Sequence, residues 1–585
     1  ITDPAQIVLQ SAANVKVNTA YVDGQGRVVE TVSKQQTPNG NDLISYKQYD
    51  EFGRETKQAL PYPSIQNNGG FIANPFSEQK NFYTSGSLNN NQYGGEYVYF
   101  GHTILESNPL GRPALVMAPG NSWAGNSRGI SYQYLTNSIN DSVRIWNIDD
   151  AIGSIPQTTL TYQPGELFKN ITIDEQNNQV VEYKDKAGQV ILKKVQINTN
   201  PGSAHMGWLC TYYIYDDYGM LRCVIQPEGV TKLLTGNWYV SGLILNEQCF
   251  RYEYDLRNRM IIKKVPGAGE VWMVYDARDR LVMTQDANLR TQNLWTYTKY
   301  DGSNRPTSSG TLNSSNNRTD HQAAAYYSID YPILSSYPFT ELTVTYYDEN
   351  LDNVFDTQDI NKLDAGSNLW PEAVVNSKLT YGKNVRSIIQ AIDHPTDQTD
   401  IRYFYDDKGR LIQTQKIGLL KKTITTTNQY DFVGKVLSTY IRHYNPSQSI
   451  PSISDITILA KIKYDVAGRV INISKRINDN PVTETNLIEN SYDELGQLKS
   501  KKLAPQFNNN TGLETLNFEY NIRGWLKSIN KDYANGTGNA NWFGQILSYD
   551  FGFTERQFNG NISGLQWRSK GDGEQRAYGF TYDNV

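Results

Sequence analysis

Apolar and polar residues alternate along much of the chain in short segments, which are separated by turn residues. Residues 401–405 (IRYFY) and 410–415 (RLIQTQ) are two such segments, and the residues DDKG between them are typical of a tight turn. Successive side chains of a strand point to opposite faces, so segments of this kind indicate half-buried strands. The pattern therefore predicts β-hairpins along the chain.

One hairpin signature recurs: an aromatic residue, Tyr, Asp, two variable residues, Gly, Arg and an apolar residue. Asp at the first turn position can accept hydrogen bonds from backbone N–H groups two residues on, and Gly at the fourth position takes a positive φ without a steric penalty. We expect Tyr to pair with the apolar residue across the hairpin, and Arg to lie over a Tyr ring of the next hairpin. Copies start at Tyr49, Tyr405, Tyr464 and Tyr492 and, in looser form, at Tyr183, Tyr215, Tyr254, Tyr275, Tyr300, Tyr347, Tyr430, Tyr520 and Tyr549.

The spacing of these turns favours one continuous sheet over a β-propeller. It is irregular and shorter than the propeller blade of about 40–45 residues. No helical pattern is available to cover the aromatic rows, so the sheet must pack on itself or curl, and twist over many hairpins yields a wall around an interior. We predict an all-β fold with under about 10% helix. Its antiparallel hairpins form a spiralling sheet around a hollow shell, which this chain need not complete.

The chain divides into two predicted domains. Residues 1–150 contain long Gly-, Asn- and Pro-rich stretches between their turns, and we interpret them as an N-terminal cap. The repeat array occupies residues 151–585, with loops or insertions at 308–317 and 348–367. Tyr582 opens another copy just before the last residue, which predicts that the natural polypeptide continues.

Composition supports an ordered chain and narrows its function. The 41 Tyr, 18 Phe and 10 Trp supply apolar area for burial, which argues against disorder. The net charge is −5 without a basic block, so nucleic acid is not an expected partner. No apolar run approaches the roughly 20 residues of a membrane-spanning helix. Lysine pairs such as Lys193–Lys194 lie in strand-like segments, and we interpret them as solvated faces.

Two segments resemble catalytic or metal sites. Residues 120–125 (GNSWAG) are one residue longer than the GxSxG motif of serine hydrolases and lack a helical pattern, so we interpret Ser122 as a loop residue.

One histidine and three cysteines are candidate zinc ligands. Zinc ligands usually show tighter paired spacings than these four residues, so we expect them to have a packing role. Three cysteines also do not favour a disulfide framework, although one bridge stays open. The four candidates are His205, Cys210, Cys223 and Cys249.

A third segment imitates the calcium-binding loop of an EF-hand. Asp348, Asn350, Asp352 and Asp359 have the spacing of its first, third, fifth and twelfth positions. The sixth position holds Asn353 instead of Gly, and flanking helices are not evident. We favour a solvated acidic loop, and calcium between Asp348 and Asp359 stays an open question.

The remaining candidates add no site. Gly382–Lys383 lacks the rest of a phosphate-binding loop. The Asp of the repeat recurs along the chain, with Asn521 in its place in the copy at Tyr520, which favours a structural role. Five histidines are scattered along the chain without an evident Ser, Cys or acidic partner: His102, His205, His321, His394 and His443. We therefore predict no catalytic residue, no cofactor, no metal and no enzymatic activity.

These residues resemble the Rhs/YD-repeat family of polymorphic toxins, over essentially the whole chain. Residues 428–439, 520–526 and 559–564 carry the resemblance in the array. The N-terminal part looks like the domain of unknown function that opens such proteins in bacteria using type IX secretion. That likeness rests on residues 21–27, 49–54, 60–63 and 118–123.

The resemblance implies a β-sheet shell around a variable C-terminal toxin, which many relatives free by self-cleavage at an Asp-Pro-x-Gly motif. This motif is absent, and the nearest dipeptide, Asp3–Pro4, is followed by Ala5 and lies at the wrong end. Autoproteolysis therefore has no assigned residue here.

Three functions compete. The first is a non-catalytic shell of an exported toxin, secreted or at the outer cell surface and used in competition between bacteria. Its expected partners are the C-terminal toxin cargo of the same polypeptide and the secretion machinery, with an immunity protein or chaperone as an open addition. The alternative is a cell-surface adhesin or glycan-binding repeat protein that uses exposed Tyr and Trp. The third is a hydrolase whose site is assembled from loops.

Overall fold

The computed structural model describes residues 10–85, 92–349, 351–392, 394, 397–448, 454–538 and 540–584. Its described part contains one sheet of 34 strands. Every pairing is antiparallel, and each strand pairs with the next along the chain, except that β4 continues to β6 while the short β5 pairs with β3. The predicted all-β architecture with one continuous sheet of hairpins is confirmed.

The first half of the sheet contains β1 (Asn18–Val22), β2 (Val28–Ser33), β3 (Leu43–Tyr49), β4 (Glu55–Ala59), β5 (Tyr62–Pro63), β6 (Phe100–Leu105), β7 (Pro113–Met117), β8 (Ile130–Thr136), β9 (Phe168–Ile173), β10 (Gln179–Lys184), β11 (Val190–Gln196), β12 (Trp208–Tyr215), β13 (Leu221–Ile225), β14 (Cys249–Tyr254), β15 (Met260–Lys264), β16 (Val271–Tyr275) and β17 (Leu281–Gln285).

The second half contains β18 (Leu294–Tyr300), β19 (Pro306–Asn313), β20 (Phe339–Tyr347), β21 (Asn384–Gln390), β22 (Gln398–Tyr405), β23 (Leu411–Ile417), β24 (Thr423–Tyr430), β25 (Val436–Tyr444), β26 (Asp455–Tyr464), β27 (Val470–Ile477), β28 (Thr485–Tyr492), β29 (Leu498–Leu503), β30 (Glu514–Tyr520), β31 (Leu526–Ile529), β32 (Phe543–Ser548), β33 (Gly564–Ser569) and β34 (Gln575–Gly579).

Helices occupy connections between strands. The α-helices are α2 (Pro75–Ser85), α3 (Pro227–Thr235), α4 (Gly242–Glu247), α5 (Ala287–Thr291), α6 (Arg318–Ala325), α8 (Phe507–Asn510) and α9 (Lys531–Ala534). The 3-10 helices are η1 (Ala124–Asn126), η2 (Ile139–Asp141), η3 (Leu334–Ser336), η4 (Asp352–Val354), η5 (Ile360–Lys362), η6 (Leu419–Lys421) and η7 (Pro481–Thr483).

Helical content is the first correction to the sequence analysis. Helices take up 12% of the chain, above the predicted limit of about 10%. The excess lies in connections that fold back onto the sheet: α3 buries Val230 and Leu233, and α6 buries His321 and Ala325. Short apolar runs inside polar connections do not repeat often enough to reveal such helices.

The segment 308–317 is a second correction. We expected a loop, but β19 extends to Asn313 and lies between β18 and β20. Hydroxyl side chains suit this place, because Ser309 Oγ and Thr343 Oγ1 share a 2.7 Å hydrogen bond across the strands. The segment 348–367 contains only η4 and η5 among its described residues, as expected for an insertion between β20 and β21.

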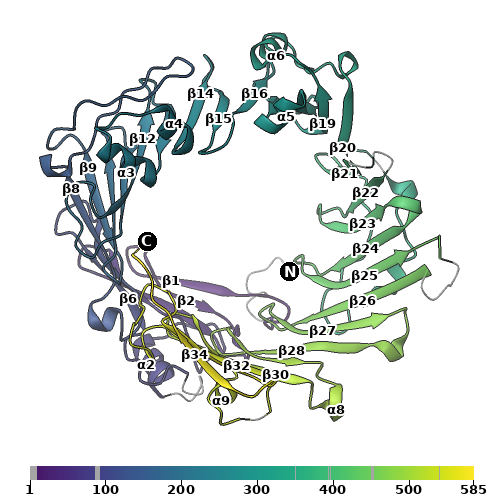
Figure 1. Ribbon diagram of the computed structural model, residues 1–585. Helices are drawn as coiled ribbons and strands as arrows, with labels where there is room; N and C mark the ends of the chain where they lie inside the picture. Colours follow the sequence, from purple (N-terminus) through teal and green to yellow (C-terminus); the bar gives the residue numbers. More distant parts are fainter. Residues whose placement is uncertain are drawn as a thin grey trace.

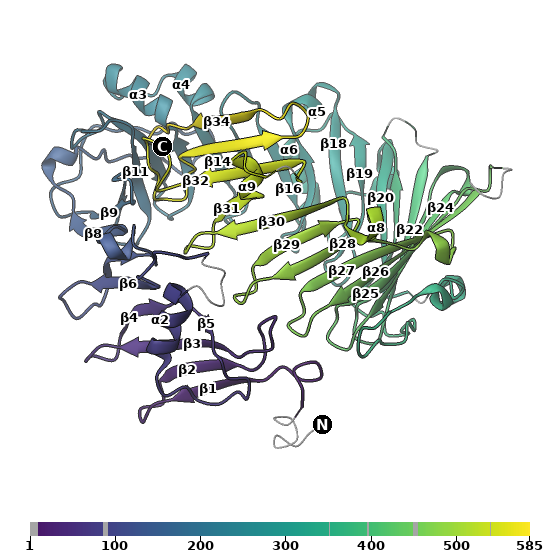
Figure 2. The same cartoon turned by 90° about the horizontal axis from the view of Figure 1, so that it is seen from below.

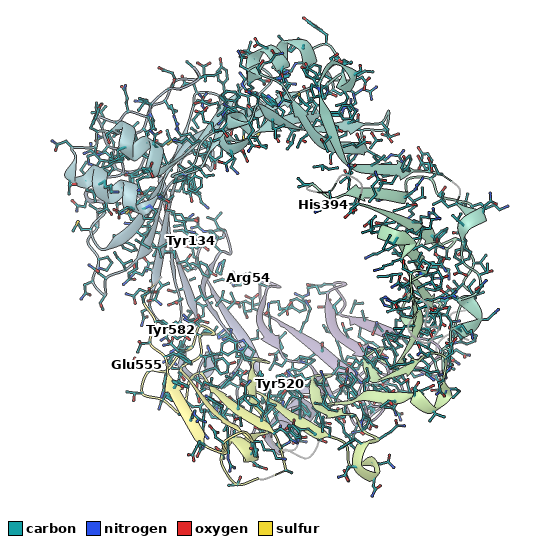
Figure 3. All side chains as sticks on the ribbon, turned by 45° about the vertical axis from the view of Figure 1, so that its right-hand side comes forward. Arg54, Tyr134, His394, Tyr520, Glu555 and Tyr582 are labelled. Carbon is teal, nitrogen blue, oxygen red and sulfur yellow. The ribbon has the colours of Figure 1, made fainter. Side chains whose placement is uncertain are left out.

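The sheet curls into a ring (Figure 1). Seen from the side, its C-terminal strands return to the N-terminal ones and lie above them, so the strands follow a spiral (Figure 2). In the described chain β1 and β34 form no strand pair with each other, so the ring overlaps without closing edge to edge. The side chains drawn leave the middle of the ring open (Figure 3).

The repeated turn has the predicted internal bonds. In the copy at Asp406, its Oδ1 accepts the N–H groups of Lys408 and Arg410 at 3.0 and 2.8 Å, and its Oδ2 accepts Arg410 Nε. Gly409 has a φ of 75°, and Tyr405 pairs with Leu411 across the hairpin. Where Gly is missing, Asn or Asp takes the left-handed conformation, which those two residues tolerate best. These substitutes are Asn177, Asn258, Asp279 and Asn304.

Most hairpins are also attached to the preceding one by their tyrosine, whereas the hydroxyl of Tyr183 donates to Asp141. The hydroxyl of Tyr275 donates to the carbonyl of Met260, just after the previous turn, at 2.7 Å. The guanidinium of Arg259, from that same turn, lies 5.0 Å from the ring centroid of Tyr275, which confirms the predicted stacking. The hydroxyls of further repeat tyrosines donate in the same way: Tyr49, Tyr215, Tyr254, Tyr300, Tyr347, Tyr405, Tyr430, Tyr464, Tyr492, Tyr520 and Tyr549.

The largest buried cluster lies where residues 143–167, α3 and α4 cover one face of β10–β14. Lys194 lies inside it and is only 1% exposed, so the expectation of a solvated lysine there was wrong. Its ammonium group donates to the carbonyls of Ser203 and Ala204, both at 2.7 Å. Burial lowers the pKa of Lys194 to about 8.

A buried ion triad fastens the covering segment to this face. Arg222 donates to the carboxylates of Asp216 and Glu253. The same guanidinium donates to the carbonyls of Asp150 and Ala151, at 2.9 and 3.1 Å. The three charged side chains are each nine-tenths or more buried.

Candidate functional site: the seam between spiral turns

The seam is the contact between residues 10–176 and residues 465–559, where the second spiral turn meets the first. Its centre is Trp123, in the loop between β7 and β8. The Trp123 side chain is 1% exposed, and its Nε1–H donates to the carbonyl of Phe558 at 2.8 Å. Its ring meets the ring of Trp525 edge to face, with centroids 5.7 Å apart. One side chain of the first turn is therefore enclosed by the second.

Backbone geometry explains the glycine three residues before it. Gly120 has a φ of 119°, and a Cβ on it would lie 2.7 Å from the Trp123 ring and 2.8 Å from Ile522. A side chain at position 120 would therefore separate the two turns.

Cations and polar groups surround the buried indole. The Arg523 guanidinium lies 5.0 Å from the Trp123 ring, and that of Arg128 lies 3.5 Å from the Phe558 ring. Further along the seam, Tyr93 donates to Gln497 at 2.8 Å, and Lys16 donates to the carbonyl of Ala467 at 2.7 Å. Other pairs that cross the seam are Asn39 with Glu494, Ser122 with Asp550, Asp174 with Asn559, and Gln176 with both Arg556 and Phe558.

Three carboxyl groups at the seam resist ionisation. Burial raises the pKa of Asp493, of Glu494 and of Glu96 above the ordinary values. A raised pKa of an acid favours folding at low pH, and this contribution is lost as pH rises through the raised pKa. The seam is therefore less stable above these raised pKa values than below them.

Comparisons with known proteins bear on the first turn. Residues 1–136 match the family model described as "Domain of unknown function (DUF6443)". Trp123 and its loop belong to this region. No curated protein matches the chain significantly. The match to this family ends at residue 136, before the predicted domain boundary at residue 150. That boundary stays a prediction, and the sheet continues across it, because β8 pairs with β9.

Solved structures similar to the chain come from Tc toxins. The chain is 13% identical to the protein in "Crystal Structure of TcdB2-TccC3 without hypervariable C-terminal region", with a TM-score of 0.39. The aligned region covers 97% of this chain and 26% of that one. A structure of TcdB2-TccC3-TEV and one of the Photorhabdus luminescens Tc holotoxin pore have the same coverage and identity, with TM-scores of 0.38. The chain thus spans about a quarter of the length of those proteins.

The structure places the predicted nucleophile candidate in the seam. Ser122 lies in a turn beside Trp123, and its hydroxyl binds Asp550. In the described part of the chain no histidine hydrogen bonds to it. The segment around Ser122 was recognised as a loop from the sequence. The packing role of the neighbouring Trp123 was missed, because its partner Phe558 lies 435 positions away.

The zinc candidates lie in the core instead of a shared site. His205 Nε2 shares a 2.8 Å hydrogen bond with the Tyr212 hydroxyl, and burial lowers the pKa of His205 to about 3. Cys210, Cys223 and Cys249 are buried free thiols. Among the described residues, no group of three or more His, Cys, Asp or Glu could hold a metal ion. The helices of the described residues are too short and too polar to cross a lipid bilayer.

The remaining histidines are separate. His102 lies on β6, His321 in α6, His394 between β21 and β22, and His443 on β25. Lys383, considered above for a phosphate loop, replaces the repeat arginine: its ammonium lies 5.3 Å from the Tyr405 ring.

The ends of the calcium-like segment are engaged differently. Asp348 accepts hydrogen bonds from Arg305 at 3.0 and 2.6 Å and from the Gly382 N–H. Asn350 lies outside the described residues, as does the Asp352 side chain. Asp359 is 2% exposed and, within the described structure, its Oδ2 has no hydrogen-bond partner. It is therefore buried, contrary to the expected solvated acidic loop, because η5 packs against the sheet.

Asp359 makes folding sensitive to pH. Burial, with a smaller effect of Asp356, raises its pKa to about 6. Its ionisation therefore opposes folding, and the stability present at low pH is lost as pH rises from the unfolded value through about 6. Asp359→Asn should raise the melting temperature at alkaline pH and leave it nearly unchanged at acidic pH. Thermal unfolding across this range checks it, and an equal shift at every pH would contradict it.

Proposed function

We propose that this chain is the non-catalytic shell of an exported toxin of the Rhs/YD-repeat type, which encloses a C-terminal effector and delivers it. The observation that carries the proposal is the ring of one antiparallel sheet, whose second turn is fastened to the first around Trp123. A wall of this kind uses its backbone hydrogen bonds internally and keeps proteases away from an enclosed segment.

The turn chemistry supports a structural role for the chain. The carboxylates of the repeat are occupied by their own turn, as in the copies at Asp255, Asp276 and Asp301, where Arg and backbone N–H groups bind them. In this proposal the effector belongs to the same polypeptide and is accompanied by an immunity protein or chaperone. Type IX secretion exports the whole to the cell surface or medium, where it acts on competing bacteria.

Limited proteolysis of the full-length protein tests the proposal. The segment after the shell should be digested at least about tenfold more slowly than the same segment expressed alone, because only the opened fraction of the shell exposes it. A Trp123→Ala variant should lose most of this protection. Digestion of the attached and free segments at equal rates would contradict the shell and favour the adhesin alternative.

A further inference from the structure

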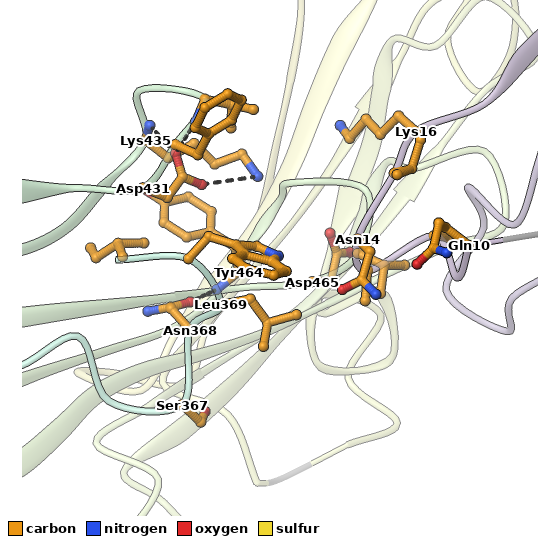
Figure 4. A pocket seen from close by; sticks show the side chains of 18 residues that line it. Gln10, Asn14, Lys16, Ser367, Asn368, Leu369, Asp431, Lys435, Tyr464 and Asp465 are labelled. Carbon is orange, nitrogen blue, oxygen red and sulfur yellow. Dashed lines mark hydrogen bonds and ion pairs between the residues drawn. The ribbon is translucent and has the colours of Figure 1, made fainter. Parts of the chain in front are cut away.

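A pocket lies where the N-terminal residues 10–16 pass two hairpin tips, at residues 431–434 and 465–468 (Figure 4). The insertion between β20 and β21 supplies its fourth side, residues 367–370. Its volume is about 920 Å³, at the upper end of the range of small-molecule sites. The pocket is separate from the Trp123 contacts.

The charged groups around this pocket are already engaged within the protein. Asp431 accepts the N–H groups of Val433 and Lys435 at 3.0 and 2.8 Å, and Asp465 binds the Arg469 side chain and N–H. Lys16 donates to the carbonyl of Ala467, and Lys435 lies 5.2 Å from the Tyr464 ring. Two acids and two bases thus offset each other, which favours a neutral ligand.

Aromatic rings are the groups that remain available. Trp370 is 62% exposed and Phe432 is 68% exposed, although both line the pocket. The Lys408 ammonium lies 4.5 Å from the centroid of the Phe432 ring, so Trp370 is the less occupied of the two. Leu369 and Val433 add exposed aliphatic surface. At the rim, Asn14 and Ser367 are exposed and offer amide and hydroxyl groups.

The Trp370 backbone is held in an unfavourable conformation. Its φ is 56°, a left-handed value that is rare for a bulky residue. The segment is fixed there because the Phe432 N–H donates to the Trp370 carbonyl at 3.2 Å and Pro371 forms a β-bridge with Asp431. Asn368 adds a side-chain bond to the carbonyl of Ile462 at 2.6 Å. Strain retained at an exposed aromatic residue is characteristic of functional positions.

We propose that this pocket binds a neutral carbohydrate. A pyranose ring has one face of C–H groups, which stacks on an aromatic ring, and a rim of hydroxyl groups, which exchange hydrogen bonds with amides and hydroxyls. Trp370 and Phe432 supply the stacking surface, while Asn14 and Ser367 reach the rim. This site goes beyond the shell function and does not depend on it.

Calorimetric titration of the protein with maltohexaose, cellohexaose and laminarihexaose tests the site. At least one of these sugars should bind with a dissociation constant of about 10 mM or lower. Trp370→Ala and Phe432→Ala should each raise that constant at least about tenfold. Phe52→Ala is the matched control, because Phe52 is an exposed aromatic residue at another hairpin tip and should leave binding unchanged. Trp370→Gly should abolish binding without lowering the melting temperature, since glycine adopts this φ freely.

Each contrary outcome would overturn the inference. No binding of any of the three sugars would remove the site, and so would binding that survives Trp370→Ala. Tighter binding of polygalacturonate would contradict a neutral ligand, and binding of apolar peptides alone would assign the pocket to protein partners. A lower melting temperature of Trp370→Gly would mean that the indole is retained for packing.

Discussion

Trp123→Ala is expected to lower the free energy of unfolding by about 3–5 kcal/mol, the cost typical of removing a large buried aromatic side chain. The indole fills the space between the loop at Gly120 and the second-turn residues Ile522, Trp525 and Phe558, and its N–H bond to the Phe558 carbonyl is lost with it. Urea denaturation measures the loss. Hydrogen exchange should show faster opening of β30–β32 than of β16–β19, because only the former lie at the seam.

Trp370→Ala is the control for this effect. That indole is mostly exposed, so the same truncation should change the free energy of unfolding by no more than about 0.5 kcal/mol. Equal effects of the two substitutions, or unchanged exchange at β30–β32, would show that the seam does not hold the spiral turns together.

The second large effect is expected for Arg222→Met, at about 3–5 kcal/mol, because it leaves two buried carboxylates without a counter-charge. Asp216 and Glu253 would lose their shared partner, and the carbonyls of Asp150 and Ala151 would lose their donors. Urea denaturation of the variant and the unaltered protein measures the loss.

Arg576→Met provides a matched comparison. Arg576 also pairs with an aspartate, Asp572, but both side chains are exposed, so the cost should stay below about 1 kcal/mol. A loss at Arg222 as small as this would contradict the buried-charge explanation.

Local structure was largely predictable from the sequence, because its causes lie within a few residues. The turn at Asp406 needs only Asp, Gly and the intervening N–H groups, and the stacking of Arg410 on Tyr430 involves adjacent hairpins. Lys194 shows where such reasoning fails. Its strand pattern was recognised, but the loop that supplies the two accepting carbonyls has no pattern of its own.

The seam and the carbohydrate pocket could not be predicted, because they join distant parts of the chain. Trp123 meets Phe558 across 435 positions, and Lys16 meets Ala467 across 451. A single sequence carries no signal for such pairs. The exposed Trp370 lies just after the segment 348–367, which was interpreted as a loop or insertion, and no sequence pattern singled it out.

The tyrosine hydroxyl bonds give the wall a direction of assembly. Except at Tyr183, each of these tyrosines binds the carbonyl that follows the preceding turn, so such a hairpin finds its attachment point only after its predecessor has formed. During synthesis or export that begins at the N-terminus, the wall could therefore grow by one hairpin at a time. Whole hairpins are the natural unit in which such a wall gains or loses circumference, since removal of one leaves the next tyrosine facing an equivalent carbonyl.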